Sequence, residues 1–171
     1  AWVYPTAVGA GSCRNVIIKE RPSGEVYNLY ANTDVDAPTV YCVLASSPST
    51  PFSASAVSTL PLNNWSHLAA TYDGSMLRMY ENGIQAGSRA ISGPLLTSTG
   101  ALRIGGNQVW GEYFQGRIDE VRIYNTALSA AQIQSDMNTP VSAGDTTPPG
   151  FSAIVAVNIT PTGATITWTT D

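Results

Sequence analysis

The first candidate for chemistry is a carboxylate inside a strand-like stretch, Gly116 to Asn125, with the sequence GRIDEVRIYN. Polar and apolar residues alternate along this stretch, which indicates a β-strand. In this alternation Asp119 shares a face with Val121 and Ile123, which we expect to be core residues. A carboxylate at the end of a buried face needs a cation, backbone N–H donors or water as its partner.

The second candidate is the aromatic loop just before that strand, NQVWGEYFQ at residues 107–115. Aromatic faces bind the C–H surfaces of sugar rings, and polar side chains hold the hydroxyl groups, so Trp110 and Tyr113 suggest a binding site. The polar candidates in the same loop are Asn107, Gln108 and Glu112. In the alternative interpretation Trp110 only fills the end of the fold, with Phe114 packed below it.

A second polar and aromatic group occurs earlier in the chain. It consists of Tyr27, Tyr30, Asn32 and Asp34. Its simplest interpretation is the outward face of an ordinary strand. We therefore do not assign it to the binding site.

Catalytic chemistry has little support in the sequence. Glycoside hydrolysis needs two carboxylates that face one cleft, but Asp119 and Glu120 are neighbours and point to opposite faces of a strand. Glu112 stands alone in its loop. The single histidine, His67, has no nucleophile motif beside it, and we expect it to be structural. We predict that the chain is not an enzyme.

The chain contains two cysteines, Cys13 and Cys42. An even pair in an exported chain suggests a disulfide. Two isolated buried thiols are an equal alternative, because sequence does not give the Cα separation that a bridge requires. One histidine and no CxxC spacing argue against zinc.

The composition limits the classes of function. The 171 residues carry a formal net charge of -4, and 12% are charged. This gives no basic surface for nucleic acid or anionic membranes, and no apolar run approaches the roughly 20 residues of a membrane span. We expect an extracellular β-protein without nucleic acid partners or membrane insertion. Strand-like patterns at both chain ends suggest an excerpt of a longer polypeptide.

The elements that must position these residues are short strands. Strand patterns lie at 1–6, 15–20, 26–32, 39–45, 65–74, 75–87 and 101–106, and 46–58 is a loop that ends in an edge strand. Asn82-Gly83 predicts a type I′ hairpin turn. Ser129 and Gln132 predict the start of one helix. We expect an antiparallel two-sheet sandwich or jelly roll, with Trp2 and Trp65 in its core and the helix over an open end.

The motifs AWVYPTA, WSHLAATYDG, LRMYENG, IGG and GRIDEVRIYNTALSAAQI occur in the order found in laminin-G-like, concanavalin A-like jelly-roll domains. Residues 1–138 resemble this family, in particular its secreted bacterial branch, with the first strand or strands missing. Residues 139–150 form a Pro/Thr/Gly linker. Residues 151–171, with strands at 154–157 and 164–168, resemble the start of a fibronectin type III module.

The resemblance implies further expectations for Asp119 and for function. Calcium-bound laminin-G-like domains and jelly-roll glucanases often carry a structural Ca²⁺. In the glucanases one ligand is the aspartate of a DxVRxY strand, which matches Asp119, Val121, Arg122 and Tyr124, so the resemblance implies Asp119 as a calcium ligand. The alternative is that Asp119 accepts hydrogen bonds from backbone N–H groups or from Arg117.

For function, the resemblance implies a non-catalytic accessory module of a secreted or surface protein, which binds polysaccharide, a cell-surface glycan or an extracellular protein. The alternatives are a structural spacer or protein-interaction module and, more remotely, a diverged hydrolase.

Overall fold

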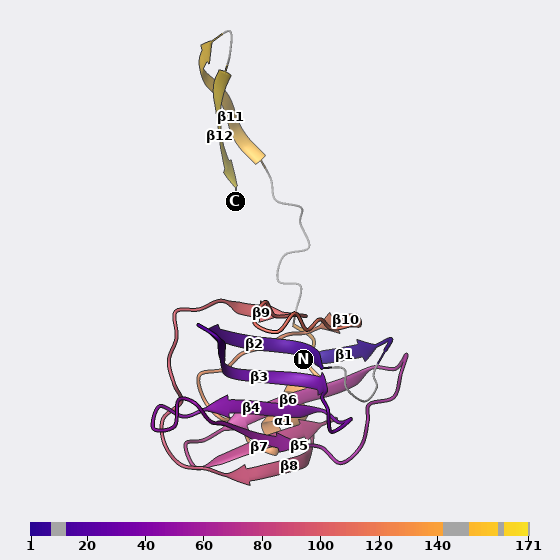
Figure 1. Ribbon diagram of the computed structural model, residues 1–171. Coiled ribbons are helices and arrows are strands. Elements are labelled where there is room, and N and C mark those ends of the chain that lie inside the picture. Colours follow the sequence, from indigo (N-terminus) through magenta and orange to yellow (C-terminus); the bar gives the residue numbers. More distant parts are fainter. Residues whose placement is uncertain (8–12, 142–150, 161–162, 171) are drawn as a thin grey trace. The chain divides into compact units, whose positions relative to one another are not determined.

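The computed structural model describes residues 1–7, 13–141, 151–160 and 163–170 (Figure 1). It divides into two compact units, Ala1–Pro140 and Val141–Asp171. The first unit consists of two five-stranded antiparallel sheets and one short helix. This confirms the predicted all-β sandwich.

The first sheet has the strand order β10-β1-β6-β7-β8. Its members are β1 (Trp2–Pro5), β6 (Ser66–Tyr72), β7 (Met76–Glu81), β8 (Ile84–Ala90) and β10 (Gly116–Asp119). The second sheet has the order β5-β4-β3-β2-β9. Its members are β2 (Arg14–Arg21), β3 (Gly24–Asn32), β4 (Thr39–Val43), β5 (Pro51–Ser55) and β9 (Leu102–Ile104).

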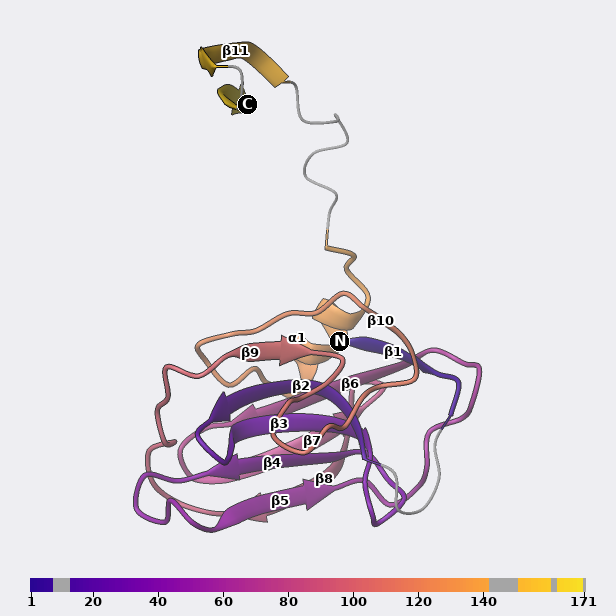
Figure 2. The same ribbon diagram turned by 45° about the horizontal axis from the view of Figure 1, so that its top comes forward.

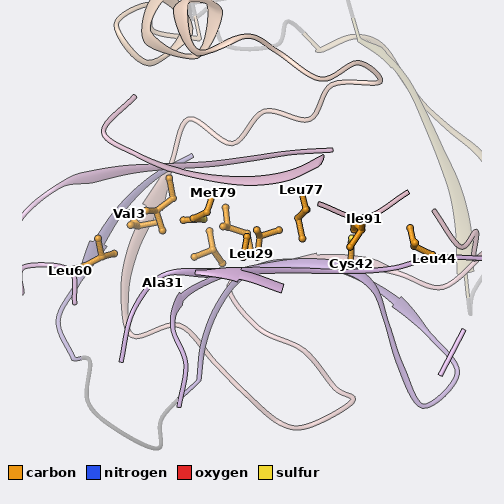
Figure 3. Close-up of a cluster of buried hydrophobic side chains, with 13 residues drawn as sticks. Val3, Leu29, Ala31, Cys42, Leu44, Leu60, Leu77, Met79 and Ile91 are labelled. Carbon is orange, nitrogen blue, oxygen red and sulfur yellow. The ribbon is translucent and has the colours of Figure 1, made fainter. Parts of the chain in front are cut away.

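The core lies between the two sheets (Figure 3). Side chains alternate between the two faces of a strand, so each strand gives every second residue to this layer. On β3 and β4 the buried apolar positions include Leu29, Ala31 and Cys42, and on β7 they are Leu77 and Met79. Burying each large apolar side chain stabilises the fold by roughly 1.5–3 kcal/mol. The apolar core therefore occupies the inner face of each sheet.

The β7–β8 hairpin turns at the predicted Asn82-Gly83 pair. Both residues have positive φ, 50° at Asn82 and 77° at Gly83. A two-residue turn of this kind matches the twist of the flanking strands, and Asn-Gly adopts it with little strain. The predicted turn is confirmed.

Strand β10 is shorter than the alternation in the sequence predicts. Its partner β1 begins at Trp2, which pairs with Asp119. The chain therefore leaves the sheet at Glu120, whose φ is 52°. The residue that packs against the core is Ile118, whereas Asp119 is exposed. The predicted core face of Asp119, Val121 and Ile123 is therefore wrong, because the strand ends before this alternation is used.

The predicted tryptophan positions also need correction. On β1 the core-facing residue is Val3, so Trp2 lies on the outer face of the first sheet, with its ring edge-on to His67. Trp65 precedes β6, is partly exposed and packs on the ring of Tyr4 at a centroid distance of 5.4 Å. Neither tryptophan belongs to the core.

Helix α1 (Ala130–Met137) begins with the predicted capping box between Ser129 and Gln132. It does not cover an open end of the sandwich. The Trp2 indole donates to the carbonyl of Met137, and the Gln134 amide donates to the carbonyl of Gly83. These contacts place the helix against the outer face of the first sheet. No helix among the described residues is long and apolar enough to cross a membrane.

The two cysteines are not bridged. Cys42 points into the core between the sheets, whereas Cys13 lines a pocket on the other face of the second sheet. Their thiols therefore lie on opposite sides of that sheet. Of the two alternatives for the cysteines, the structure contradicts the disulfide. Burial raises the pKa of each thiol to about 11.

The second unit contains β11 (Phe151–Thr160) and β12 (Gly163–Thr170), which pair antiparallel. The two strands predicted from the sequence at 154–157 and 164–168 lie within them. Most of the predicted linker, residues 142–150, lies outside the described residues. The resemblance of this unit to a fibronectin type III module stays a prediction.

Candidate functional site

A pocket of about 190 Å³ opens on the outer face of the second sheet, beside the 107–115 loop. Figure 2 shows the chain after β9 crossing this face over β2 and β3. The pocket is lined by Cys13, Glu25, Asn28, Tyr30, Thr33, Asp34, Tyr41, Pro51, Trp110 and Glu112. Five separate segments of the chain therefore build one concave site.

A larger cavity of about 420 Å³ is lined by core residues of both sheets and by the 121–128 segment. Most of its lining is apolar, and it also includes Arg122, Tyr124 and Asp136. The Asp136 carboxylate already accepts hydrogen bonds from Arg122 and Tyr124, so these polar groups are paired with one another. The smaller pocket combines aromatic rings with carboxyl and amide groups, which is the combination that a polar ligand requires. We therefore take the smaller pocket as the candidate site.

Strand pairing places the floor of the pocket. Asn28 on β3 pairs with Tyr41 on β4, and Tyr30 pairs with Thr39. These positions alternate with Leu29 and its core neighbours, so they face away from the core. The rings of Tyr30 and Tyr41 lie at a centroid distance of 6.0 Å and an interplanar angle of 89°.

A β-bulge adds Glu25 to the same face. Lys19 pairs with Tyr27, but Glu20 pairs with Glu25, so Val26 is the extra residue on β3. The bulge reverses the alternation and turns Glu25 toward the pocket. Only 6% of Glu25 is exposed. Its burial raises the pKa of its carboxyl group, and the nearby charge of Glu112 acts in the same direction.

The 107–115 loop is tied to the sheet at its start. The Glu20 carboxylate accepts hydrogen bonds from the guanidinium of Arg103, at 2.9 Å, and from the backbone N–H of Gln108, at 3.0 Å. Arg103 also donates to the side-chain oxygen of Gln108. These donors lower the pKa of Glu20, with the Gln108 N–H as the largest cause.

Glu112 connects the loop to the floor of the pocket. Its Oε2 accepts from the hydroxyl of Tyr30, at 2.5 Å, and from the side-chain amide of Asn107, at 2.8 Å. Burial and this bond raise the pKa of Tyr30. The backbone N–H of Trp110 donates to Asn107 Oδ1 at 2.8 Å. The same network therefore fixes the positions of Glu112 and of the Trp110 backbone.

Trp110 is 48% exposed and forms one wall of the pocket. It does not fill the end of the sandwich, as the alternative interpretation assumed. Phe114 does pack against the core. In this loop Phe114 therefore anchors the chain to the core, whereas Trp110 leaves an accessible aromatic surface.

The structure brings together only some of the residues predicted for the site. Trp110 and Glu112 line the pocket. Asn107 is 1% exposed and holds the loop through its hydrogen bonds with Glu112 and Trp110. Gln108 and Tyr113 are exposed and lie outside the pocket lining. Tyr113 instead contributes its carbonyl, which accepts from Arg14.

Sequence reasoning did not assign to the site the lining residues that the second sheet and the turn after β3 contribute. From the second polar and aromatic group, Tyr30 and Asp34 reach the pocket, and Asn28 and Tyr41 join them. Tyr41 stands between the core residues Val40 and Cys42, so strict alternation on this strand marks it as an outward residue. No such signal exists for Glu25, since its orientation depends on the bulge.

The candidate metal ligand Asp119 lies outside this pocket. Its Oδ1 accepts from the backbone N–H of Glu120 at 2.8 Å, which is the contact that the alternative to calcium binding predicts. Among the residues that the structure describes, no group of three or more His, Cys, Asp or Glu residues could hold a metal ion. These residues do not fit a cage of several carboxylates, and calcium at Asp119 stays a prediction.

Two solved structures have a similar fold. Domain 4 of AbnA, a GH43 extracellular arabinanase from Geobacillus stearothermophilus in complex with arabinotriose, matches with a TM-score of 0.65 and 23% identity, over 79% of this chain and 63% of that chain. A putative carbohydrate binding protein from Bacteroides ovatus matches with a TM-score of 0.62 and 21% identity, over 78% of this chain and 38% of that chain.

Two known proteins show a sequence similarity over a shorter region. Pappalysin-1 from Mus musculus is 37% identical over 80 residues, and pappalysin-1 from Homo sapiens is 34% identical over 80 residues. In both cases the match covers 44% of this chain and 5% of the pappalysin. The chain therefore corresponds to a small part of these proteins.

A laminin G family model, described as the concanavalin A-like lectin/glucanases superfamily, matches residues 1–134. The match covers most of the first unit, including both sheets, the pocket and the first turn of the helix. The chain belongs to the concanavalin A-like lectin/glucanases superfamily.

Proposed function

We propose that the chain is a non-catalytic carbohydrate-binding module of an extracellular multidomain protein, and that the pocket beside Trp110 is its binding site. One observation carries the proposal: an accessible tryptophan lines a concave surface on which Tyr30, Glu112 and the Trp110 backbone are already fixed by hydrogen bonds. A site that is formed before the ligand arrives loses less conformational entropy on binding.

The pocket offers two kinds of contact to a sugar. The ring of Trp110 provides an apolar face for the C–H side of a sugar ring. Asp34, Asn28 and Glu112 provide acceptors for hydroxyl groups, and Asn28 also provides a donor. Tyr30 and Asn107 hold Glu112 in one orientation, so its remaining acceptor positions are presented in a defined direction.

Two fold relatives support the proposal by analogy. The AbnA domain was solved in complex with arabinotriose, and the Bacteroides ovatus protein is described as a putative carbohydrate binding protein. The fold alone does not determine function. The proposal therefore depends on the pocket and uses these relatives only as support.

One observation favours hydrolysis as a second candidate function. Glu25 and Glu112 face the same pocket, and the pKa of Glu25 is raised, which is the condition of a general acid in glycoside hydrolysis. We keep binding as the proposal, because Glu112 is already committed to two hydrogen-bond donors. Release of reducing sugar that is lost in Glu25→Gln would establish the hydrolase instead.

The proposal is tested by calorimetric titration of the protein with a panel of plant, algal and bacterial oligosaccharides. We expect Trp110→Ala to weaken binding at least about tenfold, which corresponds to roughly 1.4 kcal/mol. Tyr113→Ala is the matched control, since Tyr113 is an exposed aromatic residue of the same loop outside the pocket. It should leave the affinity unchanged.

Two results would contradict carbohydrate binding at this site. Equal losses in Trp110→Ala and Tyr113→Ala would place the ligand elsewhere. Absence of binding to the whole panel would favour the alternative function, a structural spacer or a protein-interaction module.

A further inference from the structure

The charge of the pocket lining is one-sided. Three carboxylic acids line it, and none of the lining residues that the structure describes is basic. Glu25 comes from β3, Asp34 from the turn after β3, and Glu112 from the 107–115 loop. Carboxylates that converge in a partly enclosed site create a negative potential, which attracts cations and repels anions.

Glu25 is the acid that most needs a partner. It is 6% exposed, and the hydrogen-bond donor that its carboxylate meets within the described residues is its own backbone N–H. A buried carboxylate without a cation or several donors is costly to the folded protein. A ligand that brings a cation to Glu25 would remove part of that cost.

The nearest arginines are used elsewhere. Arg21 donates to the backbone carbonyls of Glu25 and Pro48, not to the Glu25 carboxylate. Arg14 donates to the carbonyl of Tyr113, and Arg103 forms its ion pair with Glu20. None of these three side chains lines the pocket, so a ligand meets no basic side chain there. Burial raises the pKa of the Glu25 carboxyl group more than the charge of Arg21 lowers it.

The rest of the lining distinguishes an organic cation from a metal ion. Tyr30, Tyr41 and Trp110 present aromatic rings, and aromatic faces attract organic ammonium groups. A metal ion instead requires several oxygen ligands at short range. The described residues contain no group of three His, Cys, Asp or Glu side chains placed to hold one.

We propose that the pocket binds a glycan residue that carries a protonated amino group, with the ammonium facing Glu25 and the sugar ring against Trp110. This inference rests on the proposed carbohydrate function and narrows its ligand to amino sugars with a free amine. The same field repels uronic acids and sulfated sugars. An N-acetylated sugar has the same ring without the charge and is the natural comparison.

The test compares three oligosaccharides of equal length by calorimetry at pH 6 and low salt. They are oligomers of glucosamine, of N-acetylglucosamine and of galacturonic acid. A free amine is protonated at this pH. We expect the glucosamine oligomer to bind at least about tenfold more tightly than its N-acetylated counterpart, and the acidic oligomer not to bind. The preference should shrink at high salt, because salt screens the charges.

A matched pair of variants locates the effect. Glu25→Gln keeps the shape of the side chain and removes its charge, so it should abolish the preference for the amine. Glu81→Gln is the control, since Glu81 is a partly buried carboxylic acid on β7 of the first sheet, outside the pocket. If Glu25→Gln does not fold, Asp34→Asn serves the same purpose at a second lining acid.

The outcomes separate the two proposals. Equal affinity for the amine and the N-acetyl oligomer would overturn the amine preference and leave carbohydrate binding intact. A preference that persists equally in Glu25→Gln and Asp34→Asn would also overturn it, since the charge would then be sensed elsewhere. Absence of binding to these oligomers and to the neutral panel would overturn the proposed function itself.

Discussion

At the scale of single residues, the site depends on side chains that touch one another rather than on sequence neighbours. Glu112 joins Tyr30 of β3 to Asn107 of the loop, over a sequence separation of 82 residues in the first case. Hydrogen bonds to a charged group contribute roughly 1.5–3 kcal/mol each. The contact between a loop carboxylate and a strand hydroxyl therefore stabilises both the loop and the binding surface.

His67 shows how one buried residue sets a pH dependence. It is 5% exposed, its ring lies edge-on to Trp2, and its Nδ1 atom has no hydrogen-bond partner. Burial lowers its pKa from 6.5 to about 4, and the nearby terminal amine acts in the same direction. Because the folded protein disfavours the protonated ring, the contribution of His67 to stability is complete above pH 6.5 and is lost as the pH falls toward 4.

We therefore predict that His67→Phe, which keeps a ring against Trp2, flattens the pH dependence of stability. Between pH 7 and pH 5 the parent protein should lose about 2 kcal/mol more than the variant in urea unfolding. His67 is the single histidine of the chain, so no other imidazole titrates in this window. An identical pH slope in the two proteins would show that His67 is accessible to protons in the folded state.

The residues of the site were only partly predictable from sequence, for a physical reason. Trp110 and Glu112 stand in a Gly-flanked loop, which made them candidates for binding, but the sequence left open whether Trp110 fills the end of the sandwich. Tyr41 and Glu25 lie on strands, and their orientation depends on register and on the bulge at Val26. A bulge shifts the alternation by one residue, and local sequence does not specify where it occurs.

At the scale of elements, Gly116 determines how β10 joins β1. Its φ is 139°, and a Cβ atom placed on it would lie 2.0 Å from the backbone carbonyl oxygen of Tyr4. That oxygen belongs to a paired strand and cannot move aside as a side chain could. The glycine is therefore required both by its backbone angle and by the close approach of β1.

We predict that Gly116→Ala destabilises the protein by about 2–4 kcal/mol, because it combines left-handed backbone strain with a backbone clash. Gly111→Ala is the control: its φ is 70°, but a Cβ atom there would meet nothing within 4 Å. It should cost only about 1–2 kcal/mol. Equal losses in urea unfolding would mean that β1 and β10 separate easily.

The elements were predicted best where the signal is local. The Asn82-Gly83 turn and the Ser129 capping box both depend on a few adjacent residues, and both were found. The end of β10 depends instead on where β1 begins, and the position of α1 depends on contacts with Trp2 and Gly83. Such long-range contacts override the alternation that predicted a strand up to Tyr124.

At the scale of the whole molecule, the sandwich separates stability from recognition. The two sheets bury their apolar residues against each other, and the outer face of the second sheet is left to carry polar and aromatic side chains. A rigid sheet with a loop across it positions ligand contacts better than a loop alone. This division lets the pocket carry buried acids at a stability cost that the core offsets.

Both sheets, the core and the pocket described above belong to Ala1–Pro140, whereas Val141–Asp171 contains one two-stranded sheet. We predict that a chain ending at Pro140 keeps its melting temperature within about 2 °C, a change below roughly 1 kcal/mol, and keeps its affinity for the glycan. A peptide of residues 151–170 should show no cooperative unfolding, because an isolated two-stranded sheet is marginal in water. Scanning calorimetry measures the melting of the shortened chain and of the peptide.

A fall of more than about 5 °C in the melting temperature of the shortened chain, well beyond 1 kcal/mol, would mean that the second unit stabilises the first. Cooperative melting of the peptide would mean that the second unit folds by itself.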